Sequence, residues 1–215
     1  MPVSLPLRFN HTFRIEVIVA SVVFGLIGLI LLYAILRSFT ARGRRPWMRH
    51  DFTRMEASYA AILAVVAAGL VTFSLTENTF LHRPARLVVH VTGFQWCWRF
   101  AYGGTPVSVT ADCVNGDIPT LMVPTGEVVR YDVTSADVIH AFWVPHLRFK
   151  TYAYPNYTNS FEDTISKPGK WMGECSEFCG LYHYAMHFEL EAVPPAQFTA
   201  WLHHKELTSP RTGAP

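Results

Sequence analysis

The segment CSEFCGLYHYAM, residues 175–186, carries two cysteines, a histidine and a methionine at short spacings. Thiolate and thioether sulfur are soft ligands that suit copper, and imidazole nitrogen suits it as well. Two thiolates on one loop can both bridge a pair of copper ions. The segment therefore predicts that Cys175, Cys179, His183 and Met186 are copper ligands.

These four side chains do not complete a two-copper site. Each ion needs a histidine, one ion also needs a weak axial methionine, and the other needs a backbone carbonyl. His140 is the strongest candidate for the second histidine, because it lies in the strand-like stretch DVIHAFWVP, residues 137–145. The site thus predicts a folded β-domain that brings a distant strand to the loop.

Other readings of the same segment leave some of its residues without a role. A Cys175–Cys179 disulfide would need neither the histidine nor the methionine. A zinc site of two cysteines and two histidines is chemically possible but leaves Met186 unexplained. A mononuclear blue-copper site uses one cysteine. A two-copper site uses every residue.

Short β-rich runs separated by proline, glycine, asparagine and aspartate surround this segment. They predict an all-β Greek-key sandwich or barrel over residues 86–193. The expected strands are Leu87–Val91, Phe94–Tyr102, Thr105–Thr110, Thr120–Val123, Val128–Thr134, Ile139–Val144, Arg148–Tyr152, Ser160–Ile165, Lys170–Glu174 and His187–Ala192. Residues 194–215 predict a helix and a disordered tail, with Phe198, Trp201 and Leu202 on one side of the helix.

Residues 1–85 predict a transmembrane hairpin. Residues 17–36 and 57–75 are uncharged runs long enough to cross a bilayer core. The linker 37–54 between them holds six arginines and one acid, so the positive-inside rule makes it cytoplasmic and puts the β-domain outside, on a bacterial plasma membrane. No cleavable signal peptide is expected. Half of the residues are hydrophobic and the net charge is +2, which argues for lipid burial and against nucleic acid.

The pattern Cys-Ser-Glu-x-Cys-Gly-x-x-His-x-x-Met closely resembles the CuA loop of cytochrome c oxidase subunit II. The stretch around His140 is similar to the first-histidine strand of that family, and GFQWCW, residues 93–98, is similar to its aromatic strand. The two-span architecture with an outer C-terminal domain matches as well. The resemblance covers nearly the whole chain.

The resemblance implies subunit II of a haem–copper oxidase, with a two-helix transmembrane hairpin and an all-β cupredoxin-like Greek-key domain. Its dinuclear copper (CuA) takes electrons one at a time from a soluble or membrane-tethered cytochrome c. The electrons pass to haem a in subunit I, where oxygen is reduced to water with coupled proton pumping. The expected partners are subunit I, other oxidase subunits, cytochrome c and membrane lipid.

The resemblance also implies roles for single residues. Glu177 gives a backbone carbonyl to one copper and a side chain to a magnesium ion shared with subunit I, unless it is a solvated loop acid. Trp96 is the residue through which electrons come in, unless it belongs to the core. Trp98 is expected to share a face with it. Glu56 lies near the cytoplasmic mouth of a proton channel in subunit I, or is an interfacial charge.

The chain departs from the family after Lys150, where Tyr152 replaces an acid. Acids are sparse on the expected docking face, and the candidates are Asp112, Asp117, Glu162 and Asp163. A Gly103–Gly104 turn would pair Cys97 with Thr110 and set Cys113 opposite Phe94. That register favours free thiols over a disulfide, although the disulfide stays open.

Two other functions fit parts of the sequence. A membrane-anchored copper chaperone or storage cupredoxin would share the copper loop and the topology, but Glu56 and Glu177 have a role only beside subunit I. A quinol oxidase subunit II would lack the copper ligands, all of which are present here.

Overall fold

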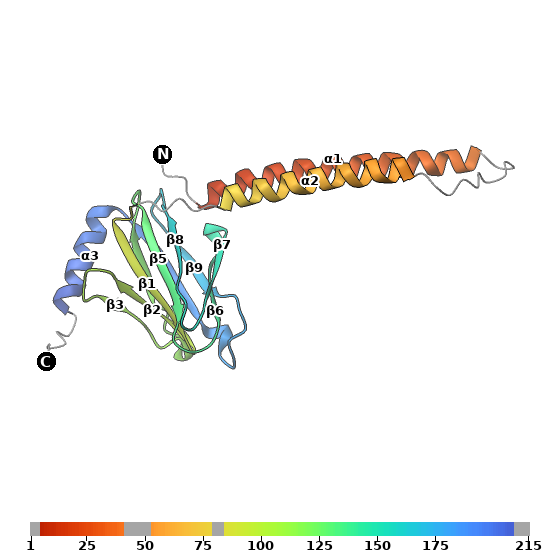
Figure 1. Ribbon diagram of the computed structural model, residues 1–215. Coiled ribbons are helices and arrows are strands. Elements are labelled where there is room, and N and C mark those ends of the chain that lie inside the picture. The colour runs from red at the N-terminus through yellow and green to blue at the C-terminus, as the bar shows by residue number, and fades with distance from the viewer. Residues whose placement is uncertain (1–4, 41–52, 79–83, 209–215) are drawn as a thin grey trace. The chain divides into compact units, whose positions relative to one another are not determined.

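The computed structural model describes residues 5–40, 53–78 and 84–208 (Figure 1). The chain divides into two compact units, residues 10–79 and residues 1–9 together with 80–215. Helices α1 (Leu5–Thr40) and α2 (Thr53–Asn78) are each long and apolar enough to cross a membrane, and the predicted spans lie inside them. Most of the predicted linker 37–54, and the tail beyond residue 208, lie outside the described residues.

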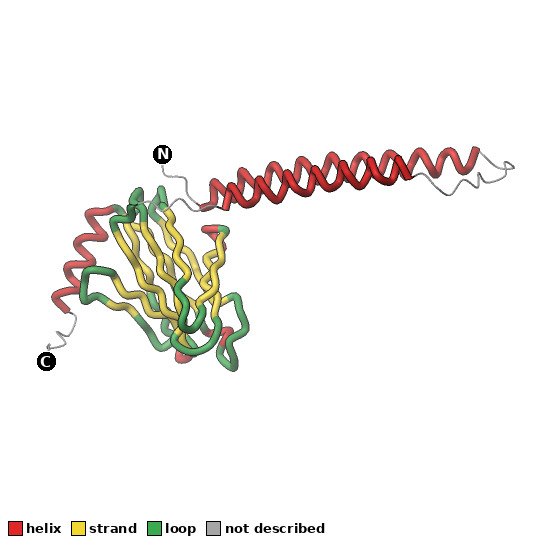
Figure 2. Tube along the Cα trace, in the orientation of Figure 1, coloured by secondary structure: helices red, strands yellow, loops and turns green. Residues whose placement is uncertain are grey.

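The second unit is a sandwich of two five-stranded sheets (Figure 2). The first sheet has the order β3-β2-β1-β5-β8, with bounds Ser108–Val109, Cys97–Tyr102, Leu87–Phe94, Val129–Ser135 and Asn159–Asp163. The second has the order β4-β10-β9-β6-β7, with bounds Thr120–Pro124, His187–Val193, Gly169–Cys175, His140–Val144 and Phe149–Ala153. Pairing is antiparallel except for β1 with β5 and β10 with β4.

Alternating burial explains why these segments form strands of a sandwich. In β5, Val129, Tyr131 and Val133 are buried while the residues between them are partly exposed. Aromatic rings fill the space between the sheets. Phe142 and Phe188 stack with ring centroids 4.7 Å apart, and Trp98 meets each of them edge-on at 5.7 Å. This core brings both sheets together beside the loop between β9 and β10.

The helix α3 (Pro195–Thr208) closes one side of the sandwich. Proline at its first position has no amide hydrogen to lose and a backbone angle that suits a helix. Phe198 is buried, and Trp201 and Leu202 pack against the core, as the sequence predicts. The ring of Trp201 lies 5.1 Å from that of Tyr102.

Cys97 and Cys113 form a disulfide, so the preference for free thiols is wrong. The prediction assumed a two-residue turn at Gly103–Gly104. The loop is longer, because the amide of Tyr102 donates to the carbonyl of Val107 at 3.0 Å. Phe100 therefore pairs with Val109, two residues further along than a Gly-Gly turn requires. This shift brings the chain after β3 back to Cys97.

Candidate metal centre

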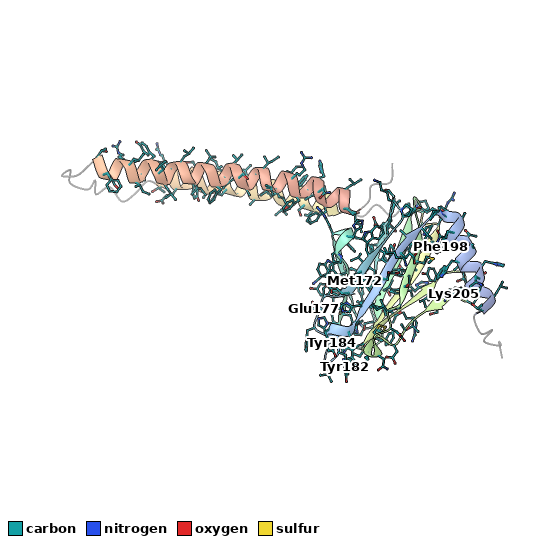
Figure 3. The ribbon with its side chains drawn as sticks, turned by 180° about the vertical axis from the view of Figure 1, so that it is seen from behind. Met172, Glu177, Tyr182, Tyr184, Phe198 and Lys205 are labelled. Atoms are coloured by element: carbon teal, nitrogen blue, oxygen red, sulfur yellow. A yellow bond between two sulfur atoms is a disulfide. The ribbon has the colours of Figure 1, made fainter. Side chains whose placement is uncertain are left out.

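The segment 175–186 forms a loop from β9 to β10, and its residues Glu177, Tyr182 and Tyr184 gather at one end of the sandwich (Figure 3). The amide of Cys175 donates to the carbonyl of Met186 at 3.0 Å, which closes the loop at its base. Gly180 has a φ of 122°, a backbone conformation that favours glycine. The amide of His183 donates to the Gly180 carbonyl at 3.1 Å, so the chain folds back towards the cysteines.

The four candidate ligands of this loop meet around the sulfur of Cys179. Its Sγ lies 3.9 Å from Cys175 Sγ, 3.5 Å from His183 Nδ1 and 3.8 Å from Met186 Sδ. Cys175, Cys179 and Met186 are buried, and His183 is partly exposed. The loop thus gathers two thiols, an imidazole and a thioether within a few ångströms.

His140 joins this group through sheet pairing. It is the first residue of β6, which pairs with β9 so that Phe142 faces Cys175. Its Nδ1 lies 4.0 Å from Cys175 Sγ, and its side chain is fully buried. The ligand atoms of His140, Cys175 and Cys179 all lie within 4.8 Å of one another. The structure therefore brings together all five side chains that the sequence suggests as copper ligands.

Asp137 holds the imidazole of His140, a contact that the sequence analysis missed. Its Oδ1 lies 2.8 Å from His140 Nε2, and its Oδ2 accepts from the amide of Gln95 at 2.7 Å. Because Nε2 is engaged by the carboxylate, Nδ1 is left to face the sulfur. A carboxylate three residues before a candidate ligand was the only sequence signal of this role.

Burial and close contacts shift the pKa values of the ligands. Burial raises the pKa of the Cys179 thiol to about 12, and the charge of Cys175 adds to the effect. Burial opposes ionisation of Cys175, but hydrogen bonds with His140 and with backbone groups leave its pKa below the ordinary value. Burial also acts to lower the pKa of His140, yet Cys175 and Asp137 together raise it. A metal that binds here must therefore displace the proton of the Cys179 thiol.

Glu177 lies between the two cysteines with its carbonyl turned inward and its side chain turned outward. The carbonyl oxygen is 3.2 Å from Cys175 Sγ, which places it beside the candidate ligands. The carboxylate is partly exposed and lies 3.9 Å from Lys150 Nζ. That ammonium also lies 4.7 Å from the ring centroid of Tyr152, the residue that the resemblance to the family suggests in place of an acid.

Trp96 lies in the turn between β1 and β2, against the copper loop. Its indole Nε1 donates to the carbonyl of Cys179 at 3.2 Å, and its ring meets that of Tyr182 edge-on at 5.0 Å. Trp96 is partly exposed, whereas Trp98 is fully buried. Both indoles donate to carbonyls of the copper loop, Trp96 to Cys179 and Trp98 to Met186. That the two rings share a face stays a prediction.

Other expected residues lie elsewhere. Glu56 is in the first turn of α2 and exposed, within the other unit. Asp163 is buried, and its Oδ1 accepts from the amide of Leu5 at 2.9 Å, so its place among the docking acids is wrong. Asp112 is exposed and caps the 3-10 turn η1 (Cys113–Asn115).

Residues 109–193 match the family described as cytochrome C oxidase subunit II, periplasmic domain. The chain is 30% identical over 222 residues to a probable cytochrome c oxidase subunit 2 of Streptomyces avermitilis, covering 84% of this chain and 68% of that protein. It is also 30% identical over 213 residues to the corresponding protein of Nocardia farcinica, covering 69% of this chain and 57% of that protein. The chain thus spans little more than half the length of the Nocardia relative.

Two solved structures of subunit II domains are similar to part of this chain. The periplasmic domain of subunit II of cytochrome oxidase from Bradyrhizobium japonicum has a TM-score of 0.53 and 30% identity, covering 58% of this chain and 96% of that domain. A mixed disulfide between a thioredoxin-like protein and subunit II of cytochrome c oxidase has a TM-score of 0.50 and 31% identity, covering 59% of this chain and 96% of the matched one. These likenesses confirm the predicted fold class.

Proposed function

Because this chain belongs to the cytochrome c oxidase subunit II family, we propose that it is the electron-transfer subunit of such an oxidase. It takes electrons one at a time from a c-type cytochrome and passes them to haem a in subunit I. Oxygen is reduced to water there, with coupled proton pumping. The observation that carries the proposal is the meeting of six donor groups at one end of the β-domain.

The donor set fits a pair of copper ions. Two thiols stand side by side and each has an imidazole Nδ1 near it, His140 for Cys175 and His183 for Cys179. The thioether of Met186 lies on one side, and the carbonyl of Glu177 on the other. Soft sulfur and imidazole donors suit copper, and zinc would leave the thioether unused. When bound, such a copper pair supplies a one-electron carrier.

The contribution of the protein to this chemistry is to hold the copper ligands in place. Asp137 holds the ring of His140 in place. The hydrogen bond from the Cys175 amide to the Met186 carbonyl holds these two ligand residues together. The buried core packs directly behind the loop. The indole of Trp98 donates to the Met186 carbonyl at 3.4 Å, which ties that core to a ligand residue. Ligands that are held by packing and by outer hydrogen bonds move little when the charge of the copper pair changes.

Electron input is assigned to Trp96. The partly exposed ring offers a contact for a donor, and its hydrogen bond to the Cys179 carbonyl leads towards the sulfur of the same residue. Tyr182 packs against the ring from the copper loop. These contacts support a short route from the surface of the domain to a copper ligand.

Trp96→Phe is therefore expected to slow reduction of the copper centre by ferrocytochrome c by about tenfold or more, which corresponds to ~1.4 kcal/mol in barrier. Phenylalanine keeps a ring but removes the indole N–H that binds Cys179. The optical and EPR spectra of copper should stay unchanged. Stopped-flow mixing of the copper-loaded full chain in detergent measures the rate, and an unchanged rate would sink this role for Trp96.

Magnesium at the boundary with subunit I is assigned to the Glu177 side chain. A partly exposed carboxylate is a suitable hard ligand for such an ion. The ammonium of Lys150 now occupies its neighbourhood, so the ion must compete with that pair. Substituting Mn²⁺ in the assembled oxidase tests the assignment: Glu177→Gln should remove the bound-manganese EPR signal, and its persistence would exclude the carboxylate as a ligand.

Glu56 is assigned to proton uptake at the cytoplasmic mouth of a channel in subunit I. The chain is a membrane protein with an outer domain, and an ionisable group at the edge of a span is often functional. In the assembled oxidase, Glu56→Ala should slow turnover and proton uptake together. Wild-type values of both would leave Glu56 as an interfacial charge only.

A further inference from the structure

We propose that the Cys97–Cys113 disulfide is a positioning device for electron input, because it fixes the turn that carries Trp96 against the copper loop. The inference rests on the proposed function. It concerns a disulfide that the sequence pattern disfavoured and that supplies no copper ligand. The disulfide begins at Cys97, the residue that directly follows Trp96.

The turn contacts the copper loop through two partly buried hydrogen bonds. Gln95 Nε2 donates to the carbonyl of Cys179 at 2.8 Å, and Trp96 Nε1 donates to the same oxygen at 3.2 Å. Gln95 is exposed and Trp96 partly exposed, so water competes for both donors. Gly180 of the copper loop also lies close to the turn, because an added Cβ there would lie 3.2 Å from the Trp96 indole nitrogen.

These contacts cross from one sheet to the other. The turn belongs to the hairpin of β1 and β2 in the first sheet, whereas the copper loop joins β9 and β10 in the second. The hydrogen bonds between β1 and β2 fix the hairpin internally, with Phe94 opposite Cys97. They do not fix the tip of the hairpin relative to the second sheet. The position of the hairpin tip relative to the second sheet sets the distance from Trp96 to Cys179.

Two hydrogen bonds tie the tip to residues outside its own sheet, from the Gln95 amide to Asp137 Oδ2 and from the Trp98 indole to the Met186 carbonyl. The disulfide adds a covalent bond to them. Cys113 opens η1, and its Sγ lies 3.6 Å from the carbonyl oxygen of His187, the first residue of β10. Both sulfurs are buried, in side chains no more than 4% exposed. The covalent bond therefore joins the tip of the first-sheet hairpin to a residue whose sulfur contacts the first residue of β10, which directly follows Met186. It runs alongside the Trp96–Cys179 contact.

The test compares wild type with two paired variants, Cys97→Ala/Cys113→Ala and Cys97→Ser/Cys113→Ser, in the full chain loaded with cuprous copper in detergent. NMR of labelled tryptophan gives the exchange rate of each indole N–H. The Trp96 indole should exchange about tenfold faster or more without the disulfide. The Trp98 indole is bound to the Met186 carbonyl inside the core and should keep its wild-type exchange rate. The double variant in which Trp98 keeps this rate is the one that preserves the fold.

Electron input is then measured by stopped-flow mixing with a soluble ferrocytochrome c. Loss of the disulfide should slow reduction about fivefold or more while the copper spectrum is retained, and in a Trp96→Phe background it should change the rate less than about twofold. A wild-type exchange rate for the Trp96 indole overturns the proposal, and so does an equal slowing in both backgrounds. A wild-type chain that ferrocytochrome c does not reduce contradicts the proposed function instead, while indole exchange still decides whether the disulfide holds the turn.

Discussion

Cys179→Ser is expected to abolish the two-copper centre and to slow reduction by ferrocytochrome c by about a hundredfold or more, equivalent to ~2.7 kcal/mol or more in barrier. The Sγ of Cys179 is the atom nearest to the other ligands, with Cys175, His183 and Met186 all within 3.9 Å of it. A serine hydroxyl stays protonated near neutral pH and is a hard oxygen donor. It cannot bridge two copper ions as a thiolate can.

The measurement is copper content together with EPR of the loaded full chain. The serine variant should bind at most one copper and show a four-line pattern. Met172→Leu provides the control, because Met172 is an exposed sulfur residue on β9 outside the centre (Figure 3). That control should keep both copper ions and the wild-type rate. A serine variant with two copper ions and a normal rate would show that Cys179 is not a bridging ligand.

Gly173→Ala is expected to destabilise the β-domain by about 1–3 kcal/mol. Gly173 pairs with Phe188 across β9 and β10, and the Phe188 ring lies over the glycine backbone. An added Cβ would lie only 2.1 Å from Cζ of that ring. The ring is fully buried among Phe142, Trp98 and Phe100, so it has little room to move away.

Thermal unfolding of the full chain in detergent, followed by near-ultraviolet circular dichroism, measures this loss. A change of this size should lower the midpoint by roughly 2–12 °C for a chain of this length. Phe188→Leu tests the cause, because a smaller side chain leaves room for the new methyl group. The double variant should lose less stability than the two single variants together. Additive losses would mean that the contact between these two residues is not the source of the strain.

The sequence predicted most of the strands, but the expected strand Phe94–Tyr102 is wrong, because a turn at residues 95 and 96 separates β1 from β2. It did not predict how the strands pair. The expected run at residues 128–134 became β5 almost unchanged, since Tyr131 and Val133 face the core. The register of β2 with β3 was missed, because loop length depends on the Tyr102–Val107 hydrogen bond rather than on the two glycines. The missed disulfide follows from that single error.

The residues of the candidate site also divide into those that the sequence reveals and those that depend on how the strands pair. The loop residues Cys175 and Cys179 could be found because metal ligands close in sequence leave a spacing pattern. His140 could be suggested only from its strand-like surroundings, and sheet pairing brings it to Cys175. Asp137 left only the signal of a carboxylate three residues before His140. Gln95 could not be assigned at all, because its contacts reach Asp137, 42 residues away, and Cys179, 84 residues away.

EPR of the copper-loaded, wild-type full chain in its one-electron-reduced state tests the central claim most directly. If the six donor groups hold a pair of copper ions that share one unpaired electron, the hyperfine pattern should have seven lines, with two copper ions bound per chain. A four-line pattern with one copper ion per chain would contradict the two-copper centre, and with it the proposed route of electrons through this domain.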